Sequence, residues 1–176
     1  MEYVAKLATT LFLLAAAASG GANGWAIAAL ACCLAGDVFL MLPSDQFVTG
    51  LASFLVGHML FIAAFISARG DDPVWGLTVG AAIFGLAVSA RPVLRGAVAE
   101  DRGLRIPVVA YMAVIATMLA TSALPDSRWA IAGAAMFFVS DSILARNRFV
   151  APIPHGRLAT MVTYHAALAL IVVSLV

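Results

Sequence analysis

Seven long apolar segments, separated by short polar breaks, constrain this chain more than any other feature of its sequence. A helix that crosses the hydrocarbon core of a membrane needs about 20 apolar residues, with a range of roughly 17–25. We expect seven such helices, at about 4–20, 25–42, 47–68, 73–90, 106–124, 129–145 and 158–175. The sequence therefore predicts an all-α, polytopic transmembrane helix bundle that forms one domain over residues 1–176.

The composition agrees with an integral membrane protein. Of the 176 residues, 64% are hydrophobic and 11% are charged, whereas soluble domains carry roughly 25% charged residues. We interpret the first segment as a retained helix rather than a signal peptide, because Glu2 offsets Lys6 in a weak n-region. We expect membrane lipids and no nucleic acid as partners, and the sequence leaves the oligomeric state open. Any activity must be built from the helices and short loops.

The distribution of basic residues predicts an orientation. Seven spans place the N-terminus and the segments 43–46, 91–105 and 146–157 on one side of the membrane. That side carries eight basic residues, which are Lys6, Arg91, Arg95, Arg102, Arg105, Arg146, Arg148 and Arg157. The opposite side carries Arg69 and Arg128. The positive-inside rule therefore predicts a cytoplasmic N-terminus and, in a bacterium, insertion into the inner membrane.

Three tryptophans supply a second argument for this topology. Trp25, Trp75 and Trp129 each open a predicted helix that follows a predicted outer loop. Tryptophan is enriched where membrane helices meet the interface, so these positions fit an aromatic belt on one side of the membrane. The 91–105 segment is expected to be a polar inner loop with turn signals at Pro92, Gly96 and Gly103, and room for a short interfacial helix.

Two acids interrupt the predicted spans. Of the nine acidic residues, only Asp37 and Asp141 fall within them, each a few residues before the inner end of its helix. An acid at the centre of a membrane helix costs roughly 2.5–3.5 kcal/mol on insertion scales and usually faces the bundle interior. Each could serve only as an interhelical hydrogen-bonding group or as a partner of Lys6. Their common depth, beside small residues, favours a shared polar cavity in the cytoplasmic half.

Other polar residues converge on the same layer. Tyr111, Tyr164, Ser140 and Lys6 fall near the predicted depth of the two acids, and His58 lies near mid-depth. Two carboxyl groups in a low-dielectric site disfavour double ionisation. A neutral acid beside an ionised base is the arrangement that acid–base hydrolysis needs at neutral pH. The tyrosines and His58 could equally pack with satisfied polar groups, without chemistry.

The residues leave two other classes of function open. A small proton-coupled transporter would also place acids within the membrane, but the sequence shows no internal repeat of the kind common in transporters. A metal-dependent lipid hydrolase is conceivable with a zinc site from His58, Asp37, Asp141 and His165. No local spacing preorganises those ligands, so we expect no metal and no other cofactor.

The ordered polar motifs resemble those of the YhhN-like family, whose characterised members are lysoplasmalogenases. They run in order over most of the chain: Lys6 with Thr9, GDVFLML (36–42), Phe47 with GLASFLVGHMLF (50–61), Tyr111 with Met118, GAAMFFVSDSIL (133–144) with Phe149, and TYHAALALI (163–171). Members commonly have a further helix before the Lys6 segment, usually giving eight spans, whereas this sequence gives seven. They usually carry Gln where this chain has Leu168, and often Tyr where it has His165.

This resemblance implies hydrolysis of the vinyl ether bond of an alkenyl lysophospholipid to a fatty aldehyde and a glycerophospho-base. The expected catalytic pair is Asp37 and Asp141, one as the protonated acid and the other orienting water and stabilising the oxocarbenium ion, by analogy with glycoside hydrolysis. The sequence does not assign the two roles. His58, Tyr111, Tyr164 and Ser140 would support that pair. Lys6 and the inner arginines would hold the phosphate.

Overall fold

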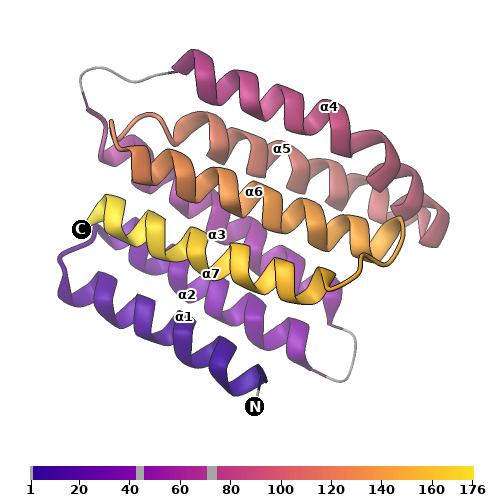
Figure 1. Ribbon diagram of the computed structural model, residues 1–176, viewed down its shortest axis with the longest axis horizontal. Helices are drawn as coiled ribbons and strands as arrows, with labels where there is room; N and C mark the ends of the chain where they lie inside the picture. Colours follow the sequence, from indigo (N-terminus) through magenta and orange to yellow (C-terminus); the bar gives the residue numbers. More distant parts are fainter. Residues whose placement is uncertain (1, 43–45, 71–74) are drawn as a thin grey trace.

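The computed structural model describes residues 2–42, 46–70 and 75–176. These residues form seven α-helices and one short 3-10 helix, and consecutive long helices run in opposite directions (Figure 1). Their bounds are α1 Glu2–Ser19, α2 Gly24–Met41, α3 Phe47–Ser67, α4 Trp75–Glu100, η1 Arg102–Leu104, α5 Arg105–Thr121, α6 Arg128–Phe149 and α7 Gly156–Leu175. The predicted all-α bundle is confirmed.

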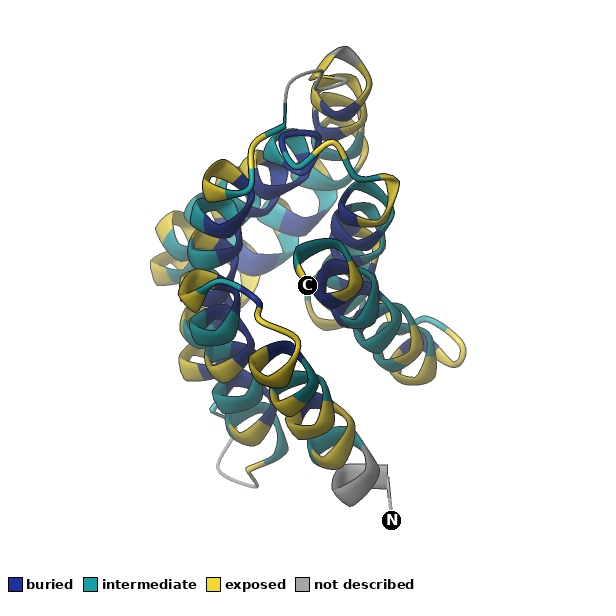
Figure 2. Ribbon diagram, turned by 90° about the vertical axis from the view of Figure 1, so that its left-hand side faces the viewer, coloured by how far each residue is buried: buried dark blue, intermediate teal, exposed yellow. Residues whose placement is uncertain are grey.

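The helices pack as a closed ring. Its order is α1, α2, α3, α5, α4, α6, α7 and back to α1, and contacts of α5 with α6 and of α2 with α7 cross the interior. Buried residues line the inner faces of the helices and exposed residues the outer faces (Figure 2). Phe61, Phe65, Phe137 and Met118 are fully buried in the shared core. The ring therefore brings side chains from distant parts of the sequence to one interior.

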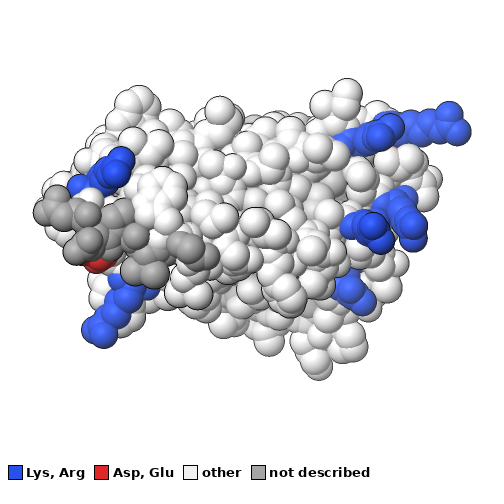
Figure 3. Space-filling view, turned by 90° about the horizontal axis from the view of Figure 1, so that it is seen from above, with Lys and Arg blue, Asp and Glu red and all other residues white. Residues whose placement is uncertain are grey.

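The outer surface has the character of a membrane protein. Six helices of the described chain, α2 to α7, are long and apolar enough to span a membrane, and Lys6–Ser19 forms a shorter apolar helix. Large apolar side chains point outward, with Ile106 80% and Phe12 72% exposed. On the face shown in Figure 3, Lys and Arg gather at the two ends and leave an uncharged belt between them. A multi-pass membrane protein explains such a surface, and the crossing of α1 stays a prediction.

The boundary predicted for the fourth helix is wrong. Its expected start at 73 lies outside the described residues, as do positions 43–45 of the expected inner loop. At its other end, α4 continues through Pro92 to Glu100 instead of ending at 90. Val93 and Ala97, one helical turn apart, are buried against Val108 of α5, and this packing extends the helix across the expected turn signals. The 3-10 helix η1 is the only short helix in the described part of that segment.

The sixth helix also extends beyond its predicted end at 145, to Phe149. The Arg148 guanidinium donates a 2.7 Å hydrogen bond to Glu100, and so joins the ends of α6 and α4. A Cβ atom at Gly96 would collide with the backbone of Phe149. Gly96 is therefore needed for the close approach of two helices, and not for a turn.

Candidate functional site

Asp37 is held by one cation and two hydroxyl donors from two other helices. The ammonium group of Lys6 in α1 lies 2.8 Å from one carboxyl oxygen. The hydroxyls of Thr10 in α1 and Tyr164 in α7 each donate to the other oxygen at 2.9 Å. Asp37 itself is fully buried. An ionised carboxylate offers only acceptors, so two hydroxyl donors and a neighbouring cation match the charged form of this acid.

Asp141 has fewer partners and a different environment. The phenol of Tyr111 in α5 donates a 2.6 Å hydrogen bond to Oδ2 of Asp141 in α6. The same oxygen lies 3.5 Å from Nε2 of His58 in α3. No lysine or arginine pairs with Asp141 among the residues the structure describes. The Asp141 side chain is 13% exposed, whereas that of Asp37 is not exposed at all.

The hydrogen bonds of His58 restrict where a proton can lie. Its Nδ1 is 2.6 Å from the backbone carbonyl of Phe54, and because a carbonyl only accepts, Nδ1 carries a hydrogen. In a neutral imidazole the lone pair then lies on Nε2, which faces Asp141. An ionised Asp141 would turn a second acceptor toward that lone pair. A single proton on this side of His58, held by Asp141 or by Nε2, removes the conflict.

Both acids line one polar cavity of about 380 Å³. The cavity lies among α1, α2, α3, α6 and α7, where the ends of these helices meet. Besides the acids its wall includes Tyr164, Asn147 and the cations Lys6, Arg148 and Arg157. The shared polar cavity expected for Asp37 and Asp141 is thus present. The cavity wall therefore combines cationic and acidic side chains.

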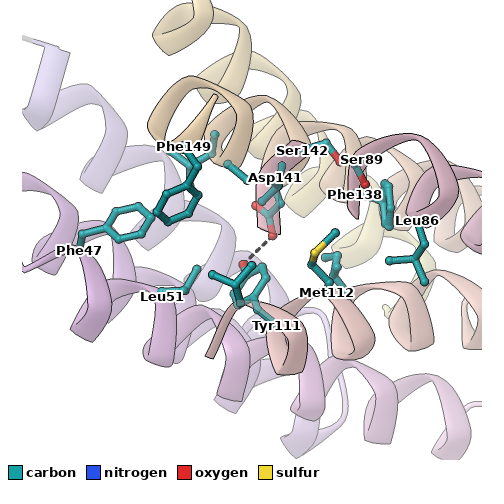
Figure 4. Close-up of a pocket in the computed structure, with 15 residues that line it drawn as sticks. Phe47, Leu51, Leu86, Ser89, Tyr111, Met112, Phe138, Asp141, Ser142 and Phe149 are labelled. Atoms are coloured by element: carbon teal, nitrogen blue, oxygen red, sulfur yellow. Dashed lines mark hydrogen bonds between the residues drawn. The ribbon is translucent and has the colours of Figure 1, made fainter. Parts of the chain in front are cut away.

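A second, apolar pocket of about 50 Å³ begins at Asp141 and runs between α3, α4, α5 and α6. Figure 4 shows the Tyr111–Asp141 hydrogen bond at its wall, with Phe47 and Phe149 on one side and Met112, Phe138 and Leu86 on the other. Phe47, Leu144 and Asp141 line both this pocket and the polar cavity. Asp141 is the only titratable side chain among them, so a carboxyl group stands at the boundary between a polar and an apolar space.

An aromatic shell fixes the position of the His58 ring. Its centroid lies 4.6 Å from that of Phe137 and 5.4 Å from that of Tyr111, and both contacts are edge-to-face. His58 is 1% exposed. A buried ring enclosed on two sides and bonded to Phe54 has little freedom to rotate. The sequence placed His58 near mid-depth, and the structure brings it next to Asp141 and away from the Asp37 group.

The remaining predicted site residues have structural contacts. The Ser140 hydroxyl donates to the backbone carbonyl of Thr160 and so links α6 to α7 beside the polar cavity. Both His165 nitrogens lie near backbone carbonyls, of Met161 at 2.8 Å and Lys6 at 3.3 Å. Leu168 is fully buried in the apolar core. Tyr164 nevertheless has its hydroxyl bonded to Oδ2 of Asp37. Oδ1 of Asp37 faces Lys6 but has no hydrogen-bond partner among the described residues.

The zinc site weighed from the sequence is not assembled. In the part of the chain that the structure describes, no three His, Cys, Asp or Glu side chains are grouped as metal ligands. Asp37 is bound by Lys6, and His165 is turned to backbone carbonyls. Of the four residues named for that site, only His58 and Asp141 are neighbours, and the described part of the chain adds no third ligand to them.

Sequence reasoning missed Thr10 and the split into two hydrogen-bonded groups. Thr10 is fully buried and binds Asp37. A threonine one turn after Lys6 on an apolar helix is a usable signal, since residues four apart share a helix face. No sequence signal assigns Tyr164 to Asp37 and Tyr111 to Asp141, because that pairing depends on which helices are neighbours in the ring.

Comparison with known proteins gives one family. The model of the YhhN family matches residues 1–175. The chain is 34% identical to the lysoplasmalogenase TMEM86B of Mus musculus over 163 residues, 90% of this chain and 67% of that protein. It is 34% identical to the Homo sapiens protein of the same name, over 93% of this chain and 68% of that protein. A lysoplasmalogenase of Mycobacterium tuberculosis is 33% identical, over 81% of this chain and 58% of that protein. No solved structure matches the chain.

Proposed function

The chain belongs to the YhhN family, and from this premise we propose that it is a lysoplasmalogenase. In this proposal it hydrolyses the vinyl ether bond of an alkenyl lysophospholipid and releases a fatty aldehyde and a glycerophospho-base. Similar proteins named lysoplasmalogenase, from mammals and mycobacteria, support the reaction class. No cofactor takes part in the scheme.

One observation carries the proposal, which is the place of Asp141 between the two cavities. In an alkenyl lysophospholipid the vinyl ether lies at the boundary between a charged, hydrophilic head group and an apolar alkenyl chain. A head in the polar cavity and the first chain carbons in the apolar pocket put the reactive double bond beside Asp141. The rest of the chain then lies along the apolar helix surfaces that face lipid. The substrate's own polarity thus selects the position of the bond to be cleaved.

The rate-limiting step of vinyl ether hydrolysis is proton transfer to the β-carbon. We assign this proton to Asp141, because the buried Nε2 of His58 faces this carboxyl group at 3.5 Å and no lysine or arginine of the described chain pairs with it. The transfer leaves an oxocarbenium ion on the carbon bonded to oxygen and an ionised Asp141. Tyr111, already hydrogen bonded to Asp141, stabilises the carboxylate that forms. General acids of this kind contribute about 10²–10⁴-fold to a rate.

Water completes the reaction. It adds to the oxocarbenium carbon to form a hemiacetal and gives up a proton, which returns the acid to its starting state. The hemiacetal then collapses to the aldehyde and the free glycerol hydroxyl. Asp37, held in the charged form by Lys6, Thr10 and Tyr164, lies in the same cavity and has the charge to orient water and stabilise the cation.

In this proposal the head group of the substrate binds next to the cations of the polar cavity. Arg157 and Arg148 line that cavity beside Asn147. Arg148 also donates to Glu100, but a guanidinium group has five N–H donors and can bind a phosphate in addition to another partner. The positive-inside rule then orients this end of the bundle toward the cytoplasm. Substrate would enter from the cytoplasmic half of the membrane, and the more polar product would leave to the same side.

The test is an activity assay of the purified protein in phospholipid nanodiscs with two matched lipids. One is an alkenyl lysophosphatidylethanolamine and the other is the acyl lysolipid with the same head and chain length. We expect free aldehyde from the first and no fatty acid from the second, with unchanged rates after dialysis against a chelator. No aldehyde, or cleavage of the acyl lipid only, would contradict the proposal. Loss of activity with the chelator would favour a metal-dependent hydrolase.

A further inference from the structure

We infer that the end of α4, together with η1 and the start of α5, forms a binding site for the phosphate head of an anionic phospholipid. This site is separate from the polar cavity and does not depend on the proposed reaction. A groove of about 660 Å³ lies there, and four of its seven lining residues are arginines: Arg91, Arg95, Arg102 and Arg105. They come from three elements that the extended α4 brings together.

The four guanidinium groups have no partner among the residues that the structure describes. None forms an ion pair or hydrogen bond within the described residues, and all four side chains are exposed. Four cations of like charge in one groove repel each other, and a bound anion would offset this repulsion. Arginines that only determined the membrane orientation would not need to line a common concave surface.

The two acids nearest in sequence are both committed elsewhere. Glu100 accepts a 2.7 Å hydrogen bond from Arg148 of α6. Asp101 caps the 3-10 helix by accepting from the Gly103 backbone nitrogen at 2.8 Å. Neither carboxylate forms an ion pair with the four arginines among the described residues. The groove is lined by four cations and no acid.

The position along the helix fits a lipid head. With 26 residues α4 extends about 39 Å, which exceeds a hydrocarbon core of about 30 Å. The last turns of α4 therefore lie at the depth of the head groups. Leu94 and Val98 form the apolar part of the groove, and Ile106 beside it is 80% exposed. Apolar contacts for acyl chains next to cations for a phosphate match a phospholipid better than a soluble phosphate ester.

Native mass spectrometry of the full chain in detergent tests this site. The protein is titrated with phosphatidylglycerol, with phosphatidylcholine of the same acyl chains, and with glycerol phosphate. Arg95→Gln/Arg102→Gln removes two cations, and Arg69→Gln, an exposed arginine at the other end of the bundle, is the matched control. We expect wild type and Arg69→Gln to bind phosphatidylglycerol about tenfold more tightly than phosphatidylcholine, and the double variant to lose this preference.

Three results would overturn the inference. Equal binding of the two lipids by wild type would show that the groove does not select anionic heads. Unchanged preference in the double variant would place the selective site elsewhere. Displacement of phosphatidylglycerol by an equal concentration of glycerol phosphate would assign the groove to soluble phosphates. If the double variant does not fold, the single Arg95→Gln variant carries the same test with a smaller expected loss.

Discussion

His58 and Asp141 face each other in the interior of the bundle, with 3.5 Å between Nε2 and Oδ2. Nδ1 of His58 is bonded to the Phe54 carbonyl, and the buried Nε2 has no hydrogen-bond partner among the described residues. A proton on Asp141 would avoid placing two acceptors opposite each other. Asp37 has a different arrangement, since a lysine forms an ion pair with it and two hydroxyls donate to it. The two acids are thus distinguished by their hydrogen-bond partners, and we propose one as proton donor and the other as fixed charge.

His58→Phe tests whether the imidazole contributes beyond packing. The phenyl ring keeps the contacts with Phe137 and Tyr111 but removes the nitrogen that faces Asp141. We expect kcat for aldehyde release to fall at least about tenfold with little change in KM, because a positioned acid is disturbed while substrate contacts remain. Steady-state kinetics measure this change in kcat, after the melting temperature of the variant has been shown to equal that of wild type. Retention of full kcat would reduce His58 to a packing residue.

Lys6→Met tests the coupling of Lys6 to Asp37. Removing the cation leaves a fully buried acid without its ion-pair partner, and breaking such a pair costs about 3–5 kcal/mol. We expect a large fall in melting temperature, and a partial recovery in Lys6→Met/Asp37→Asn, where no charge is left unpaired. Thermal unfolding of wild type, the two single variants and the double variant completes a double-mutant cycle. Additive effects would mean that the two side chains are not coupled.

Gly85→Ala tests the apolar pocket. A Cβ atom at Gly85 would lie 2.5 Å from the Phe138 ring, so the ring must move, and it lines the pocket beside Asp141. If the pocket holds the first carbons of the substrate's alkenyl chain, the variant loses room for about two methylene groups. We then expect KM to rise roughly tenfold. Gly80→Ala in the same helix is the control, since a Cβ there meets nothing within 4 Å. Equal KM values for the two variants would argue against this chain path.

Deuterium labelling tests the protonation step. In D2O the proposed mechanism delivers one deuteron to the β-carbon, which becomes the carbon next to the aldehyde group. We therefore expect the aldehyde, trapped at once by reduction, to carry a single deuterium at that carbon. Mass spectrometry of the trapped alcohol measures the label. An unlabelled chain would indicate that the ether bond breaks by another route.

Much of the fold followed from the sequence because membrane helices are strongly constrained by length and apolarity. Six of the seven predicted segments start within two residues of a helix in the structure, and the start predicted at 73 falls outside the described residues. The end of the fourth helix was wrong because burial of Val93 and Ala97 outweighs the turn signals at Pro92 and Gly96. Such packing depends on α5 and α6, which no local pattern shows.

Most side chains of the candidate site were predictable from the sequence. Thr10 was missed, and the hydrogen-bond partners of the two acids were not predictable. Depth alone grouped Asp37, Asp141, Tyr111 and Tyr164, because each lies near the same end of its helix. Their division into an Asp37 group and an Asp141 group depends on the ring order of the helices. The apolar pocket that starts at Asp141 had no sequence signal at all, since its wall comes from four helices.

Asp141→Asn is the most direct test of the central claim that Asp141 donates the proton. The amide keeps an oxygen to accept from Tyr111 but has no acidic proton, so we predict folded protein with aldehyde release at least about 100-fold slower than wild type. Asp126→Asn makes the same change at an exposed position with positive φ, which Asn tolerates, and should keep wild-type rates. The measurement is aldehyde formed from alkenyl lysophosphatidylethanolamine. Substantial turnover by folded Asp141→Asn would contradict the account.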